Sequence, residues 1–270
     1  MIIGMAVHNN ASSLEASLQS VFSQEGIRGK FLLVLVNDSS IDHWQNVVNH
    51  VADKHRTVII NVEFAKAYKT RNLILWLSRK YARNLKTIVR LDADDYFFDN
   101  RTLCQIQSRF RREYFSFNCG LRRPGLALIG SNYQICNGTI QAVPNLADNK
   151  FFKRKYLLEQ LEGMSIGIFK TELPSCNVVI RPEIPIFYPA ITSGEDHWFT
   201  VDILTSIWKK DVMIDEELMH SVYSISGSLS GVNRKKSSYL KSRQLLLKWA
   251  YERTSQKELI CYPRPISQLL

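Results

Sequence analysis

The chain has 270 residues, of which 45% are hydrophobic and 22% charged, a composition typical of a folded globular protein rather than a disordered one. Lysine and arginine outnumber aspartate and glutamate by 35 to 25, and the formal net charge of +10 favours anionic partners such as phosphorylated small molecules, nucleic acid or anionic lipid. The 5 cysteines are widely spaced and form no C-x-x-C pair, so neither a disulfide framework nor a zinc knuckle is indicated.

The sequence does not indicate a membrane-spanning segment. Its apolar start lacks the basic residues of a signal peptide. The longest apolar run, FLLVLV at residues 31–36, is far shorter than the roughly 20 residues of a membrane-spanning helix. We therefore expect a cytoplasmic protein whose contact with a membrane, if it has one, is peripheral at the inner face.

The first hundred residues alternate between strand-like and helical patterns. Short apolar or β-branched runs predict strands at 2–7, 31–36, 57–62 and 87–91. Apolar residues at helical spacing predict helices between them at 14–22, 44–51 and 70–82. We expect Ser12 or Ser13 to cap the first helix and Asp42 the second, because short polar side chains accept hydrogen bonds from the first backbone amides of a helix. This alternation predicts a parallel sheet covered by helices on both faces.

Polar residues directly follow three of these predicted strands. They are His8, Asn9 and Asn10, then Asn37 and Asp38, and finally Asp92, Asp94 and Asp95. In open parallel sheets, ligands bind beyond the carboxyl ends of the strands, where the connecting loops meet. We therefore expect these side chains to converge on one ligand site.

The second half of the chain has a less regular pattern. Strands are predicted at 126–131, 134–143 and 178–180, with a turn at Asn137 and Gly138. Helices are predicted at 151–161, 196–207 and 234–255, and the last is amphipathic and rich in lysine and arginine. No internal repeat or low-complexity linker interrupts the chain, which predicts one domain with a helical extension.

The sequence Asp92-Ala93-Asp94-Asp95 places carboxylates two residues apart at the end of a predicted strand. Mg²⁺ and Mn²⁺ prefer oxygen ligands, and magnesium sites commonly combine one or two carboxylates with phosphate oxygens of a substrate. A solvated turn without a metal explains these residues about as well when they are considered alone.

Four further observations come in a fixed order along the chain. They are the segments AVHNNASSLEASLQSVFSQ at 6–24, VNDSSID at 36–42, TRNLIL at 70–75 ahead of DADD at 92–95, and SGEDHWF at 193–199 ahead of SGSLS at 226–230. Over roughly residues 1–232, this ordered set resembles the inverting family-two glycosyltransferases of GT-A fold. The segments are similar to that family's opening strand and helix, nucleotide-binding loop, Ala-Arg-Asn helix start and Glu-Asp motif.

The resemblance implies a fold and a domain organisation. The fold would be α/β of GT-A type, a Rossmann-like nucleotide-binding fold with a mostly parallel central sheet, flanking helices and a C-terminal helical extension. Residues 1–232 would form the glycosyltransferase domain, with 1–100 as the nucleotide-sugar-binding half and 101–232 as the acceptor-binding half. Residues 233–270 would form the basic helical extension.

The resemblance also implies roles for individual residues. The nucleotide sugar would be bound by Val7, Asn9, Asp38, Arg71, Asp92 and Ala93, with Asp38 at the base, which would be uracil. Asp196 would be the catalytic base, and Glu195 and Trp198 would contact the acceptor. The cofactor would be Mn²⁺ or Mg²⁺, held by Asp94 and His220. For His220, a partly buried histidine in a strand is the alternative interpretation.

The implied reaction is an inverting transfer of a sugar from a UDP-sugar to a hydroxyl group of a saccharide or lipid-linked glycan. A divalent metal stabilises the leaving diphosphate, while a carboxylate takes the proton of the attacking hydroxyl. The basic extension could hold the protein near an anionic membrane surface. One alternative is a sugar nucleotidyltransferase, although residues 4–13 lack its glycine-rich phosphate loop. Another is a non-catalytic basic module that binds anionic surfaces, which leaves the ordered acidic motifs unexplained.

Overall fold

The computed structural model of the chain describes residues 1–81, 87–113, 126–136, 139–142, 147–167, 173, 177–191, 193–207, 212–224 and 237–255. The expected turn at Asn137 and Gly138 and the SGSLS segment at 226–230 lie outside the described residues, as do residues 256–270 of the extension. Within the described ranges, no helix is both long enough and apolar enough to span a bilayer.

The amino-terminal half forms a parallel sheet, as the alternating pattern predicts. Its strands, in spatial order, are β3 (Thr57–Val62), β2 (Leu32–Asp38), β1 (Ile2–Val7) and β4 (Ile88–Arg90). All pairings between these neighbours are parallel. The connecting helices are α1 (Ala11–Phe22), α2 (Trp44–Val51), the short 3₁₀ helix η1 (Lys54–Arg56) and α3 (Ala67–Tyr81).

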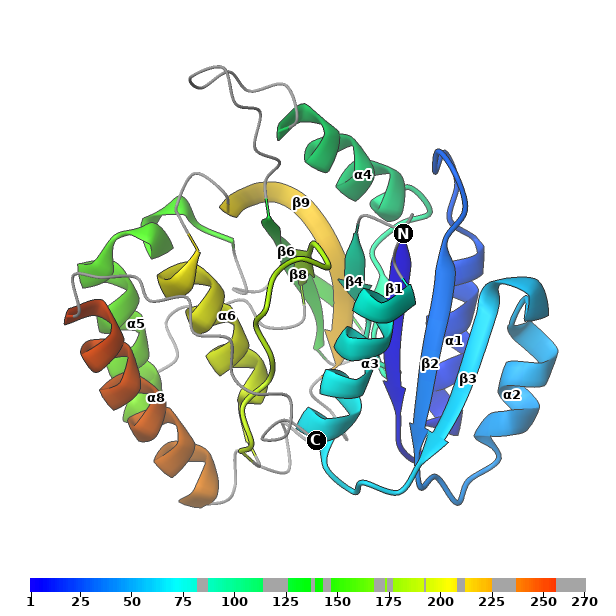
Figure 1. Ribbon diagram of the computed structural model, residues 1–270, viewed down its shortest axis with the longest axis horizontal. Coiled ribbons are helices and arrows are strands. Elements are labelled where there is room, and N and C mark those ends of the chain that lie inside the picture. The colour runs from blue at the N-terminus through cyan, green and yellow to red at the C-terminus, as the bar shows by residue number, and fades with distance from the viewer. Residues whose placement is uncertain are drawn as a thin grey trace.

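Helices cover both faces of this part of the sheet (Figure 1). Leu14 and Leu18 of α1 and Trp44 of α2 belong to the core on one face. Ile74 of α3 packs with Ile2 on the other face. Successive side chains of a strand point to opposite faces, so a strand covered on both sides is apolar throughout. This arrangement explains why β1 and β2 are continuous apolar runs.

The sheet continues into the carboxy-terminal half with mixed strand directions. Its full order is β3-β2-β1-β4-β8-β6-β9-β5, with β7 paired to β6. The further strands are β5 (Tyr96–Phe97), β6 (Ala127–Cys136), β7 (Thr139–Ala142), β8 (Val178–Ile180) and β9 (Val212–Ser224). β8 runs antiparallel to β4 and β6, whereas β6 and β9 are parallel. The expected parallel sheet is therefore confirmed for the amino-terminal half, and the rest is mixed.

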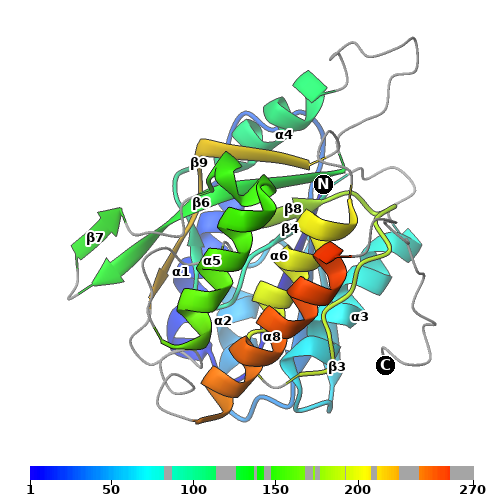
Figure 2. The same ribbon diagram turned by 90° about the vertical axis from the view of Figure 1, so that its left-hand side faces the viewer.

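The helices of the carboxy-terminal half lie together against its strands (Figure 2). They are α5 (Arg154–Ser165), α6 (Glu195–Ser206) and α8 (Ser237–Ser255), while α4 (Thr102–Glu113) follows β5 and the 3₁₀ helix η2 (Asn149–Phe152) precedes α5. Leu246 and Ala250 of α8 are fully buried in one core with Val201 of α6 and Leu158 of α5. The described part of the C-terminal extension is thus packed into the fold rather than separate from it.

The helix caps differ from those expected from the sequence. α2 has His43 at its N-cap position, and Asp42 does not cap it. Oδ2 of Asp42 instead accepts the backbone N–H of Ala11, the first residue of α1, at 2.7 Å. Neither predicted serine caps α1; Oγ of Ser13 donates to the carbonyl of Ala93 at 3.1 Å. The start of α1 is therefore tied to the acidic segment that follows β4.

Helix α3 lies unusually close to strand β1 at Gly4. A Cβ atom placed on Gly4 would overlap Cγ2 of Ile74. Isoleucine is β-branched and has few alternative rotamers, so it cannot readily turn away. Only glycine at position 4 is therefore compatible with this spacing between helix and strand.

Candidate active site

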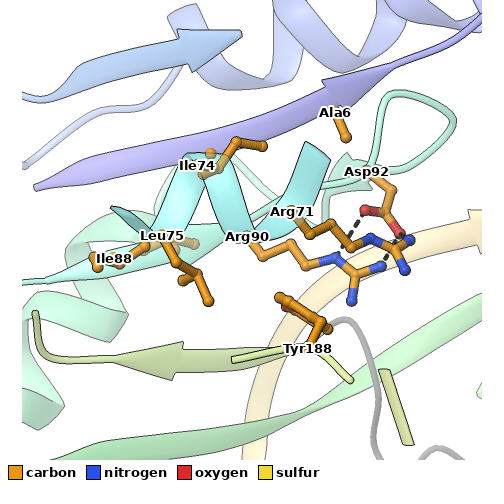
Figure 3. Close-up of a pocket in the computed structure, with 10 residues that line it drawn as sticks. Ala6, Arg71, Ile74, Leu75, Ile88, Arg90, Asp92 and Tyr188 are labelled. Atoms are coloured by element: carbon orange, nitrogen blue, oxygen red, sulfur yellow. Dashed lines mark hydrogen bonds and ion pairs between the residues drawn. The ribbon is translucent and has the colours of Figure 1, made fainter. Parts of the chain in front are cut away.

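Asp92 lies in a network of charged side chains contributed by three elements, and Figure 3 shows it together with Arg71 and Arg90. It follows β4, Arg71 lies in α3, and Glu195 is the first residue of α6. Arg71 donates from Nη2 to Oδ2 of Asp92 at 3.2 Å, and from Nη1 to Oε1 of Glu195. Arg71 therefore connects the end of the expected nucleotide-binding strand to the helix that carries the expected base, Asp196.

Arg90, the last residue of β4, is a second arginine partner of Asp92. It donates from Nε to Oδ1 of Asp92 at 2.8 Å and from Nη2 to Oδ2. Such bidentate pairing is the arrangement in which a guanidinium holds a carboxylate most specifically. Burial would raise the pKa of Asp92, but Arg90 and Arg71 together hold that pKa below its usual range. Asp92 is therefore ionised and both of its oxygens are engaged.

Tyr188 lies beneath the two guanidinium groups (Figure 3). The centre of its ring is 5.8 Å from Cζ of Arg71 and 5.6 Å from Cζ of Arg90, within the range of a cation–π contact. Asn72 fixes the backbone of Tyr188 by accepting its N–H at 2.8 Å and donating to its carbonyl at 2.9 Å. The cavity among these residues measures about 20 Å³, room for about one water molecule. A larger ligand must bind beside the arginines or displace them.

Asp196 lies next to this network in the first turn of α6. Its side chain is 20% exposed, and Oδ1 accepts the backbone N–H of His197 at 2.8 Å. Burial alone would raise the pKa of Asp196, but the ring of His197, when it carries a proton on the nitrogen that faces the carboxylate, and the guanidinium groups of Arg90 and Arg71 hold that pKa well below its usual range. The carboxylate is therefore ionised at neutral pH and able to accept a proton.

Asp94 has a different environment from Asp92. Burial and the charge of Asp92 raise the pKa of Asp94, and among the described residues no basic side chain forms an ion pair with it. The described part of the chain contains no group of three or more His, Cys, Asp or Glu side chains that could hold a metal ion alone. A metal bound jointly by a carboxylate and the phosphates of a donor fits this arrangement. Of the carboxylates of Asp92 and Asp94, that of Asp94 is the one not paired with an arginine among the described residues.

Asp38 holds the loop between β3 and α3. Its Oδ1 accepts the backbone N–H groups of Phe64 and Ala65 at 2.8 and 2.9 Å, and its Oδ2 accepts that of Lys66 at 3.3 Å and the hydroxyl of Thr70 at 2.9 Å. Burial opposes ionisation, but these hydrogen bonds lower the pKa of Asp38. The donors use the lone-pair sites of the carboxylate. Direct contact of Asp38 with a nucleotide base, as expected from the sequence, would require one donor to leave.

We expect Asp38→Ala to lower the free energy of unfolding by about 3 kcal/mol, because it leaves the buried hydroxyl of Thr70 and the partly buried backbone N–H groups of the loop without an acceptor. Urea denaturation followed by circular dichroism measures this change. Asp53 provides a matched control, since it is partly exposed, accepts the N–H of His55 at the start of η1 and pairs with Arg56 at the surface. Asp53→Ala should cost about 1 kcal/mol or less. Similar losses in the two variants would contradict the anchoring role of Asp38.

The remaining residues that are expected to bind the nucleotide sugar or the acceptor do not all lie in one place. Val7 is 1% exposed, and Ala93 is 2% exposed. Asn9 is exposed at the end of β1 and has a left-handed backbone with φ of 53°. Trp198 packs on Trp249 of α8, with ring centres 5.1 Å apart. The structure thus places Val7 and Asn9 at the end of β1 and Ala93 directly after Asp92, but it places Trp198 in the contact between α6 and α8.

His220, the second expected metal ligand, is fully buried in β9. Its ring stacks on Phe97 with a distance of 5.8 Å between ring centres. Burial lowers the pKa of His220 to about 4, and neither ring nitrogen has a hydrogen-bond partner among the described residues. In this conformation the ring is not accessible to a metal ion shared with Asp94. A buried histidine in a strand, the alternative interpretation of the sequence, describes this position.

The burial of neutral His220 predicts a loss of stability in acid. Its pKa is about 4 in the folded chain, below the ordinary value of 6.5 that we expect in the unfolded chain, so the unfolded chain takes up the proton first as the pH falls below 6.5. Proton uptake by His220 in the unfolded chain should therefore lower the free energy of unfolding by about 2 kcal/mol as the pH falls from 7 to 5. His220→Phe, which cannot take up that proton, should lose correspondingly less in urea titrations. An unchanged pH dependence in the variant would refute this assignment.

The sequence does not single out Arg90 or Tyr188. A charged residue inside the apolar run that ends at Leu91 is a usable signal for Arg90, because a buried charge in a strand needs a partner. Tyr188 lies in the irregular stretch between β8 and α6, where no periodicity marks it. Its contact with Arg71 exists only in the folded chain, because the two residues are far apart in the sequence.

Comparison with known proteins gives one family match. The family model described as "Glycosyl transferase family 2" matches residues 2–161. No curated protein matches the chain.

Solved structures of similar fold include three glycosyltransferase-type proteins. TarS residues 1–349 of S. aureus in complex with UDP is 16% identical, with a TM-score of 0.60 over 95% of this chain and 72% of that chain. The mannosyltransferase PcManGT of Pyrobaculum calidifontis with GDP-Man and Mn²⁺ is 13% identical, with a TM-score of 0.54 over 94% and 72%. Glucosyl-3-phosphoglycerate synthase of Mycobacterium tuberculosis with Mn²⁺ and UDP is 11% identical, with a TM-score of 0.51 over 95% and 80%. At these identities the likeness establishes a shared fold.

Proposed function

The chain belongs to glycosyl transferase family 2, and we propose that it moves a sugar from a nucleotide-diphosphate donor to a hydroxyl group of a saccharide or lipid-linked glycan, with inversion at the anomeric carbon. UDP is the nucleotide we favour, because two of the structurally similar proteins described above hold UDP. Asp196 is the proposed base, and Asp94 the proposed metal ligand.

One juxtaposition supports this proposal most strongly. The acidic segment after β4 and the first turn of α6 face each other across the guanidinium group of Arg71, which contacts both Asp92 and Glu195. A donor bound at the strand ends would present its anomeric carbon towards α6. A base on the far side of that carbon is what a single displacement needs.

Asp196 is better suited to the role of base than Glu195. The carboxylate of Glu195 is paired with Arg71, whereas Asp196 has no ion pair to an arginine among the described residues within 4 Å. The oxygen of the acceptor hydroxyl would attack the anomeric carbon while Asp196 takes its proton. The bond between that carbon and the diphosphate oxygen breaks, and the nucleoside diphosphate leaves with the electron pair. Attack opposite the leaving group inverts the anomeric configuration.

Mn²⁺ or Mg²⁺, when bound, would neutralise charge on the leaving diphosphate. Asp94 would hold the metal, and the remaining ligands would come from the donor and from water. Arg71 and Arg90 keep Asp92 ionised and fixed. In this arrangement Asp92 would orient the site, while Asp94 would hold the metal.

A donor screen tests the proposal. The purified chain is mixed with Mn²⁺ and each member of a panel of UDP- and GDP-sugars, and its melting temperature is measured; a bound donor raises stability by mass action. Each stabilising donor is then tested for release of nucleoside diphosphate with saccharide acceptors. Failure to bind any nucleotide sugar, together with no diphosphate release, would overturn the proposal. Release of pyrophosphate from a nucleoside triphosphate would support a nucleotidyltransferase instead.

A further inference from the structure

The C-terminal helix α8 touches the start of α6, where the proposed base is located. We propose that Arg243 of α8 is a positioning residue that holds the segment Ser193–His197 and thereby keeps the carboxylate of Asp196 available to the acceptor. This inference rests on the proposed function of Asp196. It assigns a role in the reaction to a helix that lies beyond the family match at residues 2–161.

Arg243 is a buried cation whose contact with α6 is direct. It is 3% exposed, and its Nη2 lies 3.0 Å from Nδ1 of His197, which is itself 8% exposed. Cζ of the guanidinium also lies 4.1 Å from the centre of the ring of Tyr239, within the range of a cation–π contact. A guanidinium can only donate hydrogen bonds, so Nδ1 of His197 must accept in this contact, which leaves Nε2 as the ring nitrogen that carries a proton.

The same nitrogen of His197 faces Asp196. Nδ1 lies 3.3 Å from Oδ1 of Asp196, close enough to donate to the carboxylate if it carried a proton. Arg243 needs a lone pair on this atom, whereas Asp196 would need a proton on it, so the two compete for Nδ1. By holding the lone pair towards itself, Arg243 prevents His197 from occupying the carboxylate as a donor. The proposed base then keeps a lone pair for the acceptor hydroxyl.

Gly194 makes room for this guanidinium. Its backbone has φ of 74°, in the left-handed region that side chains rarely adopt, and it immediately precedes Glu195. A Cβ atom on Gly194 would overlap Nη1 of Arg243. Glycine at this position therefore serves two purposes, since it permits the turn into α6 and admits the arginine from α8.

Two further contacts from α8 flank the arginine. Oγ of Ser242 donates to the carbonyl of Ser193, one residue before the glycine. Trp249 packs on Trp198, one turn of helix further along. These contacts attach α8 to the start of α6 from Ser193 to Trp198, on both sides of Asp196.

Buried charge argues against a purely structural role. Nε and Nη1 of Arg243 are buried and have no hydrogen-bond partner among the described residues. Burying an incompletely paired cation is costly, and apolar side chains would fill the same space with less loss. The exposed lysines of α8, Lys241 and Lys248, have no such role in the contact. Arg243 thus differs from these lysines because it is buried against α6, whereas all three residues are basic.

The test compares Arg243→Ala and Arg243→Lys with Lys248→Ala, a basic residue exposed on the same helix. We expect Arg243→Ala to lower kcat roughly 10- to 100-fold, because small displacements of a catalytic group have effects of this size. Donor Kd from titration calorimetry should stay within about threefold of wild type, since the donor lies at the strand ends. Arg243→Lys should recover part of the loss and Lys248→Ala should match wild type. Equal kcat in wild type and Arg243→Ala, or equal losses in Arg243→Ala and Lys248→Ala, would overturn the proposal.

A second variant keeps the test decisive if Arg243→Ala folds poorly. Gly194→Ala displaces the guanidinium directly and should lower kcat as well. Because both changes break one contact, their effects on kcat should fall short of multiplying in the double variant. If the fold-losses in kcat of the two single variants multiplied in the double variant, the two residues would act independently, and their shared role would be overturned.

Hydrogen exchange provides a readout that needs no activity. The backbone amides of His197 and Trp198 should exchange faster in Arg243→Ala than in wild type, and unchanged protection would overturn the contact. If the wild-type chain transfers no sugar, but Arg243→Ala still loses this protection from exchange, the proposed function is overturned and the contact remains supported.

Discussion

Asp196→Asn should lower kcat by about 10²- to 10⁴-fold, the range that a positioned general base contributes, while donor binding is retained. Asparagine has nearly the same shape as aspartate but cannot take up the proton of the acceptor hydroxyl at neutral pH. Initial rates of UDP release with saturating acceptor measure the change in kcat. Calorimetric titration with UDP and Mn²⁺ measures whether the donor site is intact.

Asp202→Asn provides the matched control for this variant. Asp202 lies on the same helix, but its carboxylate is 3.7 Å from Arg253 and accepts from Ser206, on the side facing α8. Its neutralisation should leave kcat within about threefold of wild type. If Asp196→Asn kept wild-type activity, the base would have to be another group. If it lost donor affinity as well, Asp196 would belong to the donor site.

Asp94→Ala should remove metal-dependent donor binding as well as turnover. The variant should lose the metal that stabilises the charge of the leaving diphosphate. Losing several kcal/mol of this stabilisation corresponds to a decrease of kcat/KM on the order of 10³-fold. The expected signature is specific: titration with UDP should show affinity that rises with Mn²⁺ in wild type but not in the variant. Arg71 and Arg90 remain in the variant, so weak metal-independent binding of UDP should persist.

Asp99→Asn is the control for Asp94. Oδ1 of Asp99 accepts the N–H of Arg101 ahead of α4, and asparagine keeps that acceptor. This variant should retain the manganese dependence. If Asp94→Ala also retained it, the metal would be held elsewhere, and Asp92 would have to release Arg90 to serve as the ligand.

The convergence of polar residues after β1, β2 and β4 can be predicted because it depends on local patterns and one topological rule. Apolar runs define the strands, and parallel strands bring their carboxyl ends together. The identity of the side chains that meet Asp92 cannot be predicted in this way. Tyr188 and Glu195 lie near Asp92 in the fold although they are about a hundred residues away in the sequence. Arg90 lies within an apolar strand, where the pattern gives it no special role.

The long strand β9 is not predicted by the sequence pattern, for a local reason. Acidic residues at 215–217 interrupt its apolar pattern, and one of them, Asp215, pairs with Arg109 of α4. The pairing of β6 with β9 also shifts register near Ser131. Because a register shift breaks the alternation of buried and exposed side chains, the pattern no longer has the period of a strand.

Asp38 shows the limit of assigning a residue from a family motif. The resemblance assigns it to the nucleotide base, whereas in this structure it accepts hydrogen bonds from the loop that leads into α3. Nothing in the spacing of VNDSS distinguishes a carboxylate that binds a ligand from one that shapes the loop beside it. The distinction depends on donors some 26 residues later in the chain.

The close approach of α3 to β1 at Gly4 has a consequence for how variants of this protein would be interpreted. Arg71 lies on α3 one turn before Ile74, the residue that leaves no room for a side chain at position 4. Any larger residue at Gly4 would push the helix outward and withdraw Arg71 from both Asp92 and Glu195. A variant of this kind that still folds should lose activity, and a genetic screen scored on activity alone would mistake Gly4 for a substrate contact.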